Sequence, residues 1–120
     1  MTTTVLIVDD HETFRSFARA LLESEGFEVI GEAGDGTSGV EAVEALGPDL
    51  VVLDVQLPDI SGFQVLERLR ADGVLTPVVL TSSRDVSSYG DRVDTSDALG
   101  FIPKAELSGD AVRAAMAGAR

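Results

Sequence analysis

Short apolar runs alternate along the chain with segments in which apolar residues recur at helical spacing. An apolar run of a few residues bounded by turn residues is typical of a strand buried on both faces of a sheet. Segments with apolar residues three and four positions apart are predicted as helices. The runs predicted as strands are residues 5–8, 27–33, 49–54, 77–82 and 98–102.

The segments between these runs predict helices with recognisable ends. The first begins near His11, ends at Gly26 and carries one apolar face. A second spans 37–46 before Gly47-Pro48, and a third spans 61–72 between a Ser61 cap and a Gly73 stop. Segment 85–95 is more polar and predicts only a weaker helix, and Ser108 caps a last one. The apolar faces of the first and last helices comprise Phe14, Phe17, Ala18, Leu21 and Leu22, and Ala111, Val112, Ala115 and Met116.

Strand–helix alternation repeated five times predicts a parallel sheet whose strands are joined by right-handed crossovers. Because the strands are continuous apolar runs, helices are expected on both faces of the sheet. The fold class is therefore α/β, a three-layer α/β/α sandwich. A length of 120 residues suits one domain, so residues 1–120 are predicted to form a single domain.

The charge and composition exclude several classes of function. The formal net charge is −12, and the nine Lys and Arg residues form no run, so phosphate backbones and anionic membranes would be repelled. We expect no direct nucleic-acid binding and no membrane association; simple solubility is an equally good explanation of the charge. The chain has no cysteine and one histidine, which excludes disulfides, thiolate chemistry and a multi-histidine metal cage. The start resembles neither a signal peptide nor a membrane span, so a cytoplasmic location is expected.

Polar side chains follow four of the five predicted strands. Asp9-Asp10 end the first, Asp54 ends the third, Thr81-Ser82-Ser83 end the fourth, and Lys104 follows the fifth. Because the carboxyl ends of parallel strands meet at one edge of a sheet, these groups are predicted to converge there.

Such a cluster has a definite chemistry. Adjacent acids repel one another unless a cation is present, and Mg²⁺ favours carboxylates, water and phosphate as ligands. A lysine adds a compact positive charge that can anchor an anion. Together these groups suit phosphoryl transfer onto an aspartate. Taken alone, Asp9-Asp10 would be a helix cap and Asp54 the start of a turn; the full set favours a metal site.

Asp9-Asp10, Asp54 followed by LPDISG, Ser82 and Lys104, in this order, resemble the receiver domain of bacterial two-component response regulators. The resemblance covers the whole chain. DDHETFR and GEAGDG also resemble the subgroup fused to helix-turn-helix output domains. The family implies a flavodoxin-like fold with strand order 2-1-3-4-5. It also implies a non-enzymatic switch, a sensor histidine kinase as phosphoryl donor, a downstream protein or fused output domain, and a phosphorylation-dependent homodimer.

The resemblance also implies a role for each matching position. Asp54 would accept the phosphoryl group, while Asp10, Asp9 and the backbone carbonyl of Gln56 would join Asp54 in holding Mg²⁺. Ser82 would bond the phosphoryl group, Lys104 would pair with it, and Phe101 would change rotamer on activation. These roles concern Asp9, Asp10, Asp54, Gln56, Ser82, Phe101 and Lys104.

Several alternatives remain open. Thr81 competes with Ser82 for the switch hydroxyl, and Pro103 precedes Lys104 where the family often has a proline after the lysine, so no cis-proline turn is expected there. His11 is expected to lie in the first turn of a helix beside the acids, to point away from this edge of the sheet and to be exposed. The rival functions are a degenerate receiver, a binding module for flavin or nucleotide, and an aspartyl-phosphate hydrolase, which would want an acid in place of Gln56.

Overall fold

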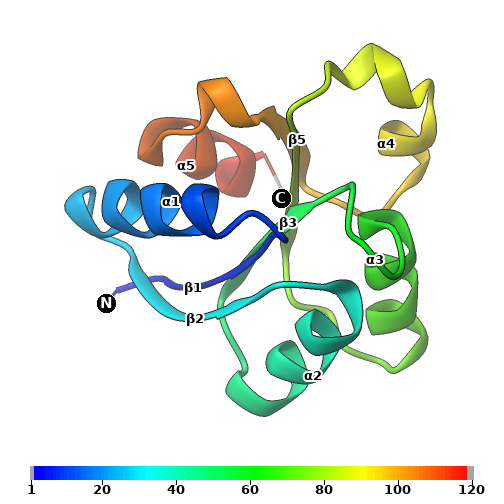
Figure 1. The fold of residues 1–120 in the computed structure, drawn as a ribbon, viewed down its shortest axis with the longest axis horizontal. Coiled ribbons are helices and arrows are strands. Elements are labelled where there is room, and N and C mark those ends of the chain that lie inside the picture. The colour runs from blue at the N-terminus through cyan, green and yellow to red at the C-terminus, as the bar shows by residue number, and fades with distance from the viewer. Residues whose placement is uncertain (1, 119–120) are drawn as a thin grey trace.

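The computed structural model describes residues 2–118, which fold around a five-stranded parallel sheet (Figure 1). The strand order is β2-β1-β3-β4-β5, which confirms the predicted order 2-1-3-4-5. All four strand pairings are parallel. The strands are β1 (Thr4–Val8), β2 (Glu28–Ala33), β3 (Leu50–Asp54), β4 (Val78–Ser82) and β5 (Gly100–Pro103).

Within residues 2–118, four long helices connect or follow the strands, close to the predicted positions. The Asp35 side chain caps α2 by accepting a hydrogen bond from Ser38 N–H. A reciprocal pair of hydrogen bonds between Ser61 and Gln64 caps α3, and Ser108 caps the last helix as expected. These helices are α1 (Glu12–Ser24), α2 (Gly36–Leu46), α3 (Gly62–Ala71) and α5 (Gly109–Ala117).

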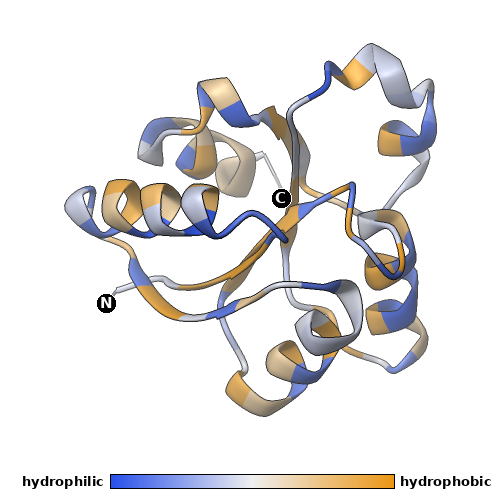
Figure 2. Ribbon diagram, in the orientation of Figure 1, coloured by the Kyte–Doolittle hydropathy of each residue, from blue (hydrophilic) through white to orange (hydrophobic). Residues whose placement is uncertain are grey.

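The sheet separates two apolar cores, which confirms the three-layer prediction. Side chains alternate across each strand, so Val52 and Val79 face α1 and α5, whereas Leu53 and Leu80 face α2 and α3. Figure 1 shows the two pairs of helices on opposite sides of the strands, and Figure 2 shows the apolar colouring of those strands. Phe17, expected on the core face of α1, is instead 54% exposed.

Segment 85–95 does not form the single weak helix that we predicted. It contains a 3₁₀ turn, η1 (Val86–Tyr89), and a one-turn helix, α4 (Arg92–Thr95), separated by Gly90 at φ +59°. Neither turn contains a buried residue, so little apolar burial stabilises a longer helix here. In Figure 1 this segment is the wide yellow loop that carries α4.

The carboxyl end of β3 and the start of α3 lie unusually close together. A Cβ atom at Gly62 would lie 2.4 Å from the backbone oxygen of Asp54 and 2.9 Å from Cα of Val55. Only glycine allows this approach, which fixes the loop 55–61 over the end of the sheet. No helix within residues 2–118 has the length and apolar character needed to cross a membrane.

Candidate functional site

Asp54 lies buried at the end of the central strand β3, with 2% of its surface exposed. Its Oδ1 accepts a hydrogen bond from Gln56 N–H at 3.1 Å, and its Oδ2 accepts one from Lys104 Nζ at 3.3 Å. Burial raises the pKa of Asp54 from 3.8 to about 6, reinforced by Asp9 and opposed by the Gln56 N–H and the Lys104 charge. The carboxylate is thus held in an environment that disfavours its charge.

Lys104 is the cation of this site and follows β5 directly. Its Nζ lies 2.6 Å from Asp9 Oδ2 and 3.3 Å from Asp54 Oδ2, and it lies 4.6 Å from the centre of the Phe14 ring. Burial opposes the ammonium charge, but the contacts with Asp9 and Asp54 outweigh it and raise the pKa of Lys104. Lys104 therefore bridges the ends of β1 and β3 as a charged group.

Asp9 is fixed by hydrogen bonds on its backbone and side chain. Its N–H donates to Ala33 O at 3.0 Å, and its carbonyl accepts from Arg15 Nη1 at 2.5 Å. Its Oδ1 accepts from His11 N–H at 2.8 Å. Asp9 is therefore presented to the site from a rigid strand end.

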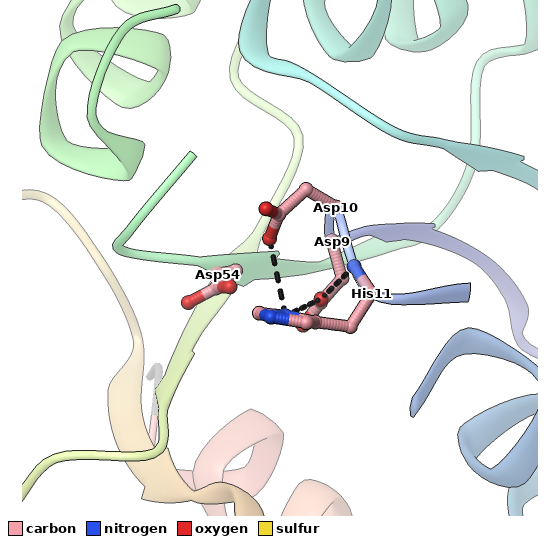
Figure 3. Close-up of side chains that lie close together, drawn as sticks. All are labelled: Asp9, Asp10, His11 and Asp54. Carbon is pink, nitrogen blue, oxygen red and sulfur yellow. Dashed lines mark hydrogen bonds and ion pairs between the residues drawn. The ribbon is translucent and has the colours of Figure 1, made fainter. Parts of the chain in front are cut away.

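The three predicted acids lie together with one residue that was expected to point elsewhere. One ligand atom from each of Asp9, Asp10, His11 and Asp54 falls within 4.8 Å of the others (Figure 3). His11 is exposed as expected, but its Nδ1 lies 3.3 Å from Asp9 Oδ1 and 3.1 Å from Asp10 Oδ1. It lies beside the acids as expected, but the prediction that it points away from this edge of the sheet was wrong, because the chain turns at His11 into α1 and directs the ring toward Asp9 and Asp10.

The donor set fits a small hard cation. Besides the Lys104 ion pair, Asp9 Oδ2 has no hydrogen-bond partner within residues 2–118, although it is buried. A buried carboxylate oxygen facing two further carboxylates is the arrangement that Mg²⁺ stabilises. Gln56, whose backbone carbonyl was predicted as a ligand, lies in the adjoining loop, two residues after Asp54.

Asp59 anchors that loop, a role that sequence reasoning missed. Its carboxylate accepts hydrogen bonds from Gly36 N–H at 2.8 Å, Thr37 N–H at 2.9 Å and the Thr37 hydroxyl at 2.8 Å. The N–H groups of Gly36 and Thr37 hold the pKa of Asp59 well below its usual range. No local signal in the sequence points to this role, because the helix start that Asp59 contacts lies more than twenty positions away.

The two candidate switch hydroxyls at the end of β4 have different surroundings. Thr81 is the in-register neighbour of Asp54, and its buried hydroxyl has no hydrogen-bond partner among the described residues. Ser82 is fully buried; its Oγ lies 2.6 Å from the Tyr89 hydroxyl and accepts from Arg84 N–H at 3.0 Å. By strand alternation, Thr81 faces the α1–α5 side and Ser82 the α3 side.

Phe101, the predicted rotamer switch, is partly buried on β5 beside Tyr89, whose hydroxyl lies against Ser82. Its ring centre lies 5.9 Å from that of Tyr89, which in turn lies 5.8 Å from that of Phe63. No sequence signal had singled out Tyr89, since it lies in the polar segment whose structure was poorly predicted.

Comparison with known proteins shows the family to which the chain belongs. Residues 5–116 match the family described as Response regulator receiver domain. The chain belongs to this family. It is 39% identical over 113 residues to BvgA of Bordetella pertussis, whose name describes a positive transcription regulator of virulence factors. It is 36% identical over 101 residues to the DNA-binding transcriptional activator EvgA of Escherichia coli K12.

These alignments cover 94% and 84% of this chain but 54% and 50% of BvgA and EvgA, so the chain spans about half the length of these relatives. Among solved structures, the signal receiver domain of NarL from Mycobacterium tuberculosis superposes with a TM-score of 0.83 at 32% identity, covering 96% of this chain and 97% of that one. The predicted family and its resemblance to receivers of transcription regulators are thereby confirmed. The chain is a receiver domain of the two-component response regulator type.

Proposed function

We propose that this receiver is a phosphorylation-activated switch in which Asp54 accepts a phosphoryl group from a phosphohistidine of a sensor histidine kinase. The observation that carries the proposal is the position of Asp54: a buried carboxylate at a strand end, in contact with Lys104 and flanked by Asp9 and Asp10. A carboxylate in this setting is a suitable nucleophile to attack phosphorus and form an acyl phosphate.

The transfer step uses the ionised form of Asp54. With a pKa of about 6, most molecules carry the carboxylate at neutral pH. One carboxylate oxygen attacks phosphorus, the phosphorus–nitrogen bond of the phosphohistidine breaks, and its electron pair returns to the imidazole. The contacts with Gln56 N–H and Lys104 Nζ hold the carboxylate in one orientation for this attack.

A divalent cation belongs to this reaction, and the side chains present suit Mg²⁺. Asp9, Asp10, Asp54 and the backbone carbonyl of Gln56 would hold it. When bound, Mg²⁺ supplies positive charge that offsets the negative charge on the phosphoryl oxygens. Lys104 supplies a second, protein-borne positive charge at the same edge of the sheet.

The phosphoryl group now on Asp54 is a dianion, and the surrounding residues respond to its charge. Lys104 pairs with a phosphoryl oxygen, and Ser82 turns its hydroxyl toward another. Phe101 follows into the space that Ser82 leaves, and the face formed by α4, β5 and α5 changes shape. Two packings separated by a few kcal/mol suffice for such a switch. The changed face controls a downstream protein or a fused output domain, directly or through a phosphorylation-dependent homodimer.

The test is the intact mass of the protein after incubation with acetyl phosphate and Mg²⁺. The wild type is expected to gain one phosphoryl group, and Asp54→Asn is expected to gain none. The control Asp94→Asn alters an exposed acid on α4 and is expected to gain one phosphoryl group, as the wild type does. A wild type that gains nothing in the presence of Mg²⁺ would instead be a degenerate receiver that acts through protein contacts alone.

A further inference from the structure

The hydroxyl of Ser82 is already engaged in the unphosphorylated protein. Its Oγ lies 2.6 Å from the Tyr89 hydroxyl and also accepts a hydrogen bond from the backbone N–H of Arg84 at 3.0 Å. A serine hydroxyl has one proton to donate and two lone pairs with which to accept. A phosphoryl oxygen on Asp54 only accepts, so when Ser82 donates its proton to the Tyr89 hydroxyl, it must give up that bond to reach the phosphoryl group.

Tyr89 connects this hydroxyl to the least buried part of the molecule. Its ring packs between Phe63 of α3, at 5.8 Å, and Phe101 of β5, at 5.9 Å. It is the last residue of η1, and neither η1 nor α4 contains a buried residue. Tyr89 is thus a main attachment of this segment to the core, and segments with so few buried contacts open at low free-energy cost.

We propose that Tyr89 is a latch that couples the Ser82 hydroxyl to segment 86–95, and that phosphorylation of Asp54 releases it. This inference rests on the proposed function, since Ser82 must turn toward the phosphoryl group. A hydrogen bond to a phosphoryl oxygen is charge-assisted and stronger than one between two neutral hydroxyls. Ser82 therefore exchanges the Tyr89 hydroxyl for the phosphoryl oxygen, and the partly buried phenol loses its partner.

Release of Tyr89 changes a surface beyond the site itself. Phe63, which packs edge-on against Tyr89, also lines a groove of about 450 Å³ between α3 and α4. Arg92 of α4 lies 4.3 Å above the same Phe63 ring, on the wall of this groove. A movement of Tyr89 is therefore passed to α4 through a shared aromatic ring.

The chain provides its own reporter of this movement. It contains one tyrosine and no tryptophan, so its intrinsic fluorescence comes from Tyr89. Acrylamide is the suitable quencher, because a net charge of −12 would repel iodide. Phosphorylation with acetyl phosphate and Mg²⁺, with stoichiometry checked by intact mass on the same sample, is expected to raise the quenching constant at least twofold.

Two variants test the latch without phosphorylation. Ser82→Ala removes the hydroxyl that holds Tyr89 and is expected to raise quenching in the unmodified protein, whereas Ser83→Ala, at the exposed neighbouring serine, should match the wild type. Tyr89→Phe keeps the ring but removes its hydroxyl. Unphosphorylated Tyr89→Phe is expected to exchange amide hydrogens in 86–95 as fast as the phosphorylated wild type, with global unfolding little changed. Val86→Ala, in the same turn, is the control.

The outcomes separate the two proposals. An adduct on Asp54 with unchanged quenching would refute the latch and leave the phosphorylation switch intact. No adduct would overturn the proposed function and with it the trigger of the latch. Unchanged quenching in unphosphorylated Ser82→Ala would refute the Ser82–Tyr89 coupling whatever the outcome of phosphorylation.

Discussion

Removal of the charge at Asp54 is expected to stabilise the metal-free protein at neutral pH. Burial is the main reason why the pKa of Asp54 rises from 3.8 to about 6. At about 1.4 kcal/mol per pKa unit, this rise corresponds to about 3 kcal/mol of unfavourable free energy in the folded, ionised state. Asp54→Asn removes that cost, but its amide cannot repeat every contact of the carboxylate, so a gain of about 1–3 kcal/mol is expected.

The gain has a definite pH dependence. A carboxyl whose pKa is higher in the folded state binds more protons there, so the wild type loses stability as pH rises from 3.8 to about 6. Below that window both states are protonated and the cost is absent; above it the full cost is present. The difference between Asp54→Asn and the wild type should therefore grow through the window and level off at neutral pH.

Urea denaturation in the presence of EDTA measures this difference, from about pH 4.5 to about pH 7.5. Groups that do not interact with Asp54 titrate alike in both proteins and cancel in the comparison. Asp94→Asn, at an exposed acid, should stay within about 0.5 kcal/mol of the wild type at every pH. A difference that does not vary with pH, or a wild type that is more stable than Asp54→Asn at neutral pH, would refute burial as the dominant influence on Asp54.

Three further substitutions probe the frame around the site. Lys104→Gln leaves two buried acids without their cation, so metal-free stability should fall by about 3 kcal/mol, and Mg²⁺ should raise the melting temperature of the variant more than that of the wild type. Asp59→Asn weakens the anchor of the loop on α2; because the pKa of Asp59 is lowered, the loss in urea stability should be full at neutral pH and shrink below about pH 4. Gly62→Ala forces a Cβ atom against the Asp54 carbonyl, so it should cost about 2 kcal/mol or more and abolish phosphorylation by acetyl phosphate, while Gly34→Ala should be tolerated.

The sheet and its edge could be predicted because each strand carries its own signal. Runs such as residues 50–53 are apolar at every position, and the acid or hydroxyl that ends a run marks the edge of the sheet. The fold class and strand order followed from this pattern and the family resemblance. Segment 85–95 could not be predicted, since it lacks helical periodicity and its apolar contacts with the core are made by Tyr89 and Val93, which pack against residues distant in the sequence.

The contacts within the site were harder to predict than its residues. The Ser82–Tyr89 hydrogen bond and the Asp59 anchor join segments whose relative position depends on the packing of whole elements. His11 was misplaced for a related reason: its direction is set by how α1 leaves the strand end, which spacing in the sequence does not encode. Residue types at strand ends thus indicate the chemistry, while tertiary packing decides which polar atoms meet.

The balance of charge at the site supports the proposal that a divalent cation acts there together with Lys104. Asp9, Asp10 and Asp54 set three carboxylates against the one ammonium of Lys104, so the edge is negative before any phosphoryl group arrives. An incoming phosphoryl group is itself an anion, and without further positive charge it would approach a repelling surface. A divalent cation held by Asp9, Asp10 and Asp54 would supply this positive charge, and Lys104 could then turn from Asp9 toward the phosphoryl oxygens. Under the proposed function, electrostatics therefore predicts that the cation binds before the phosphoryl group arrives, and that Lys104 and Ser82 move as a consequence of the transfer rather than as its cause.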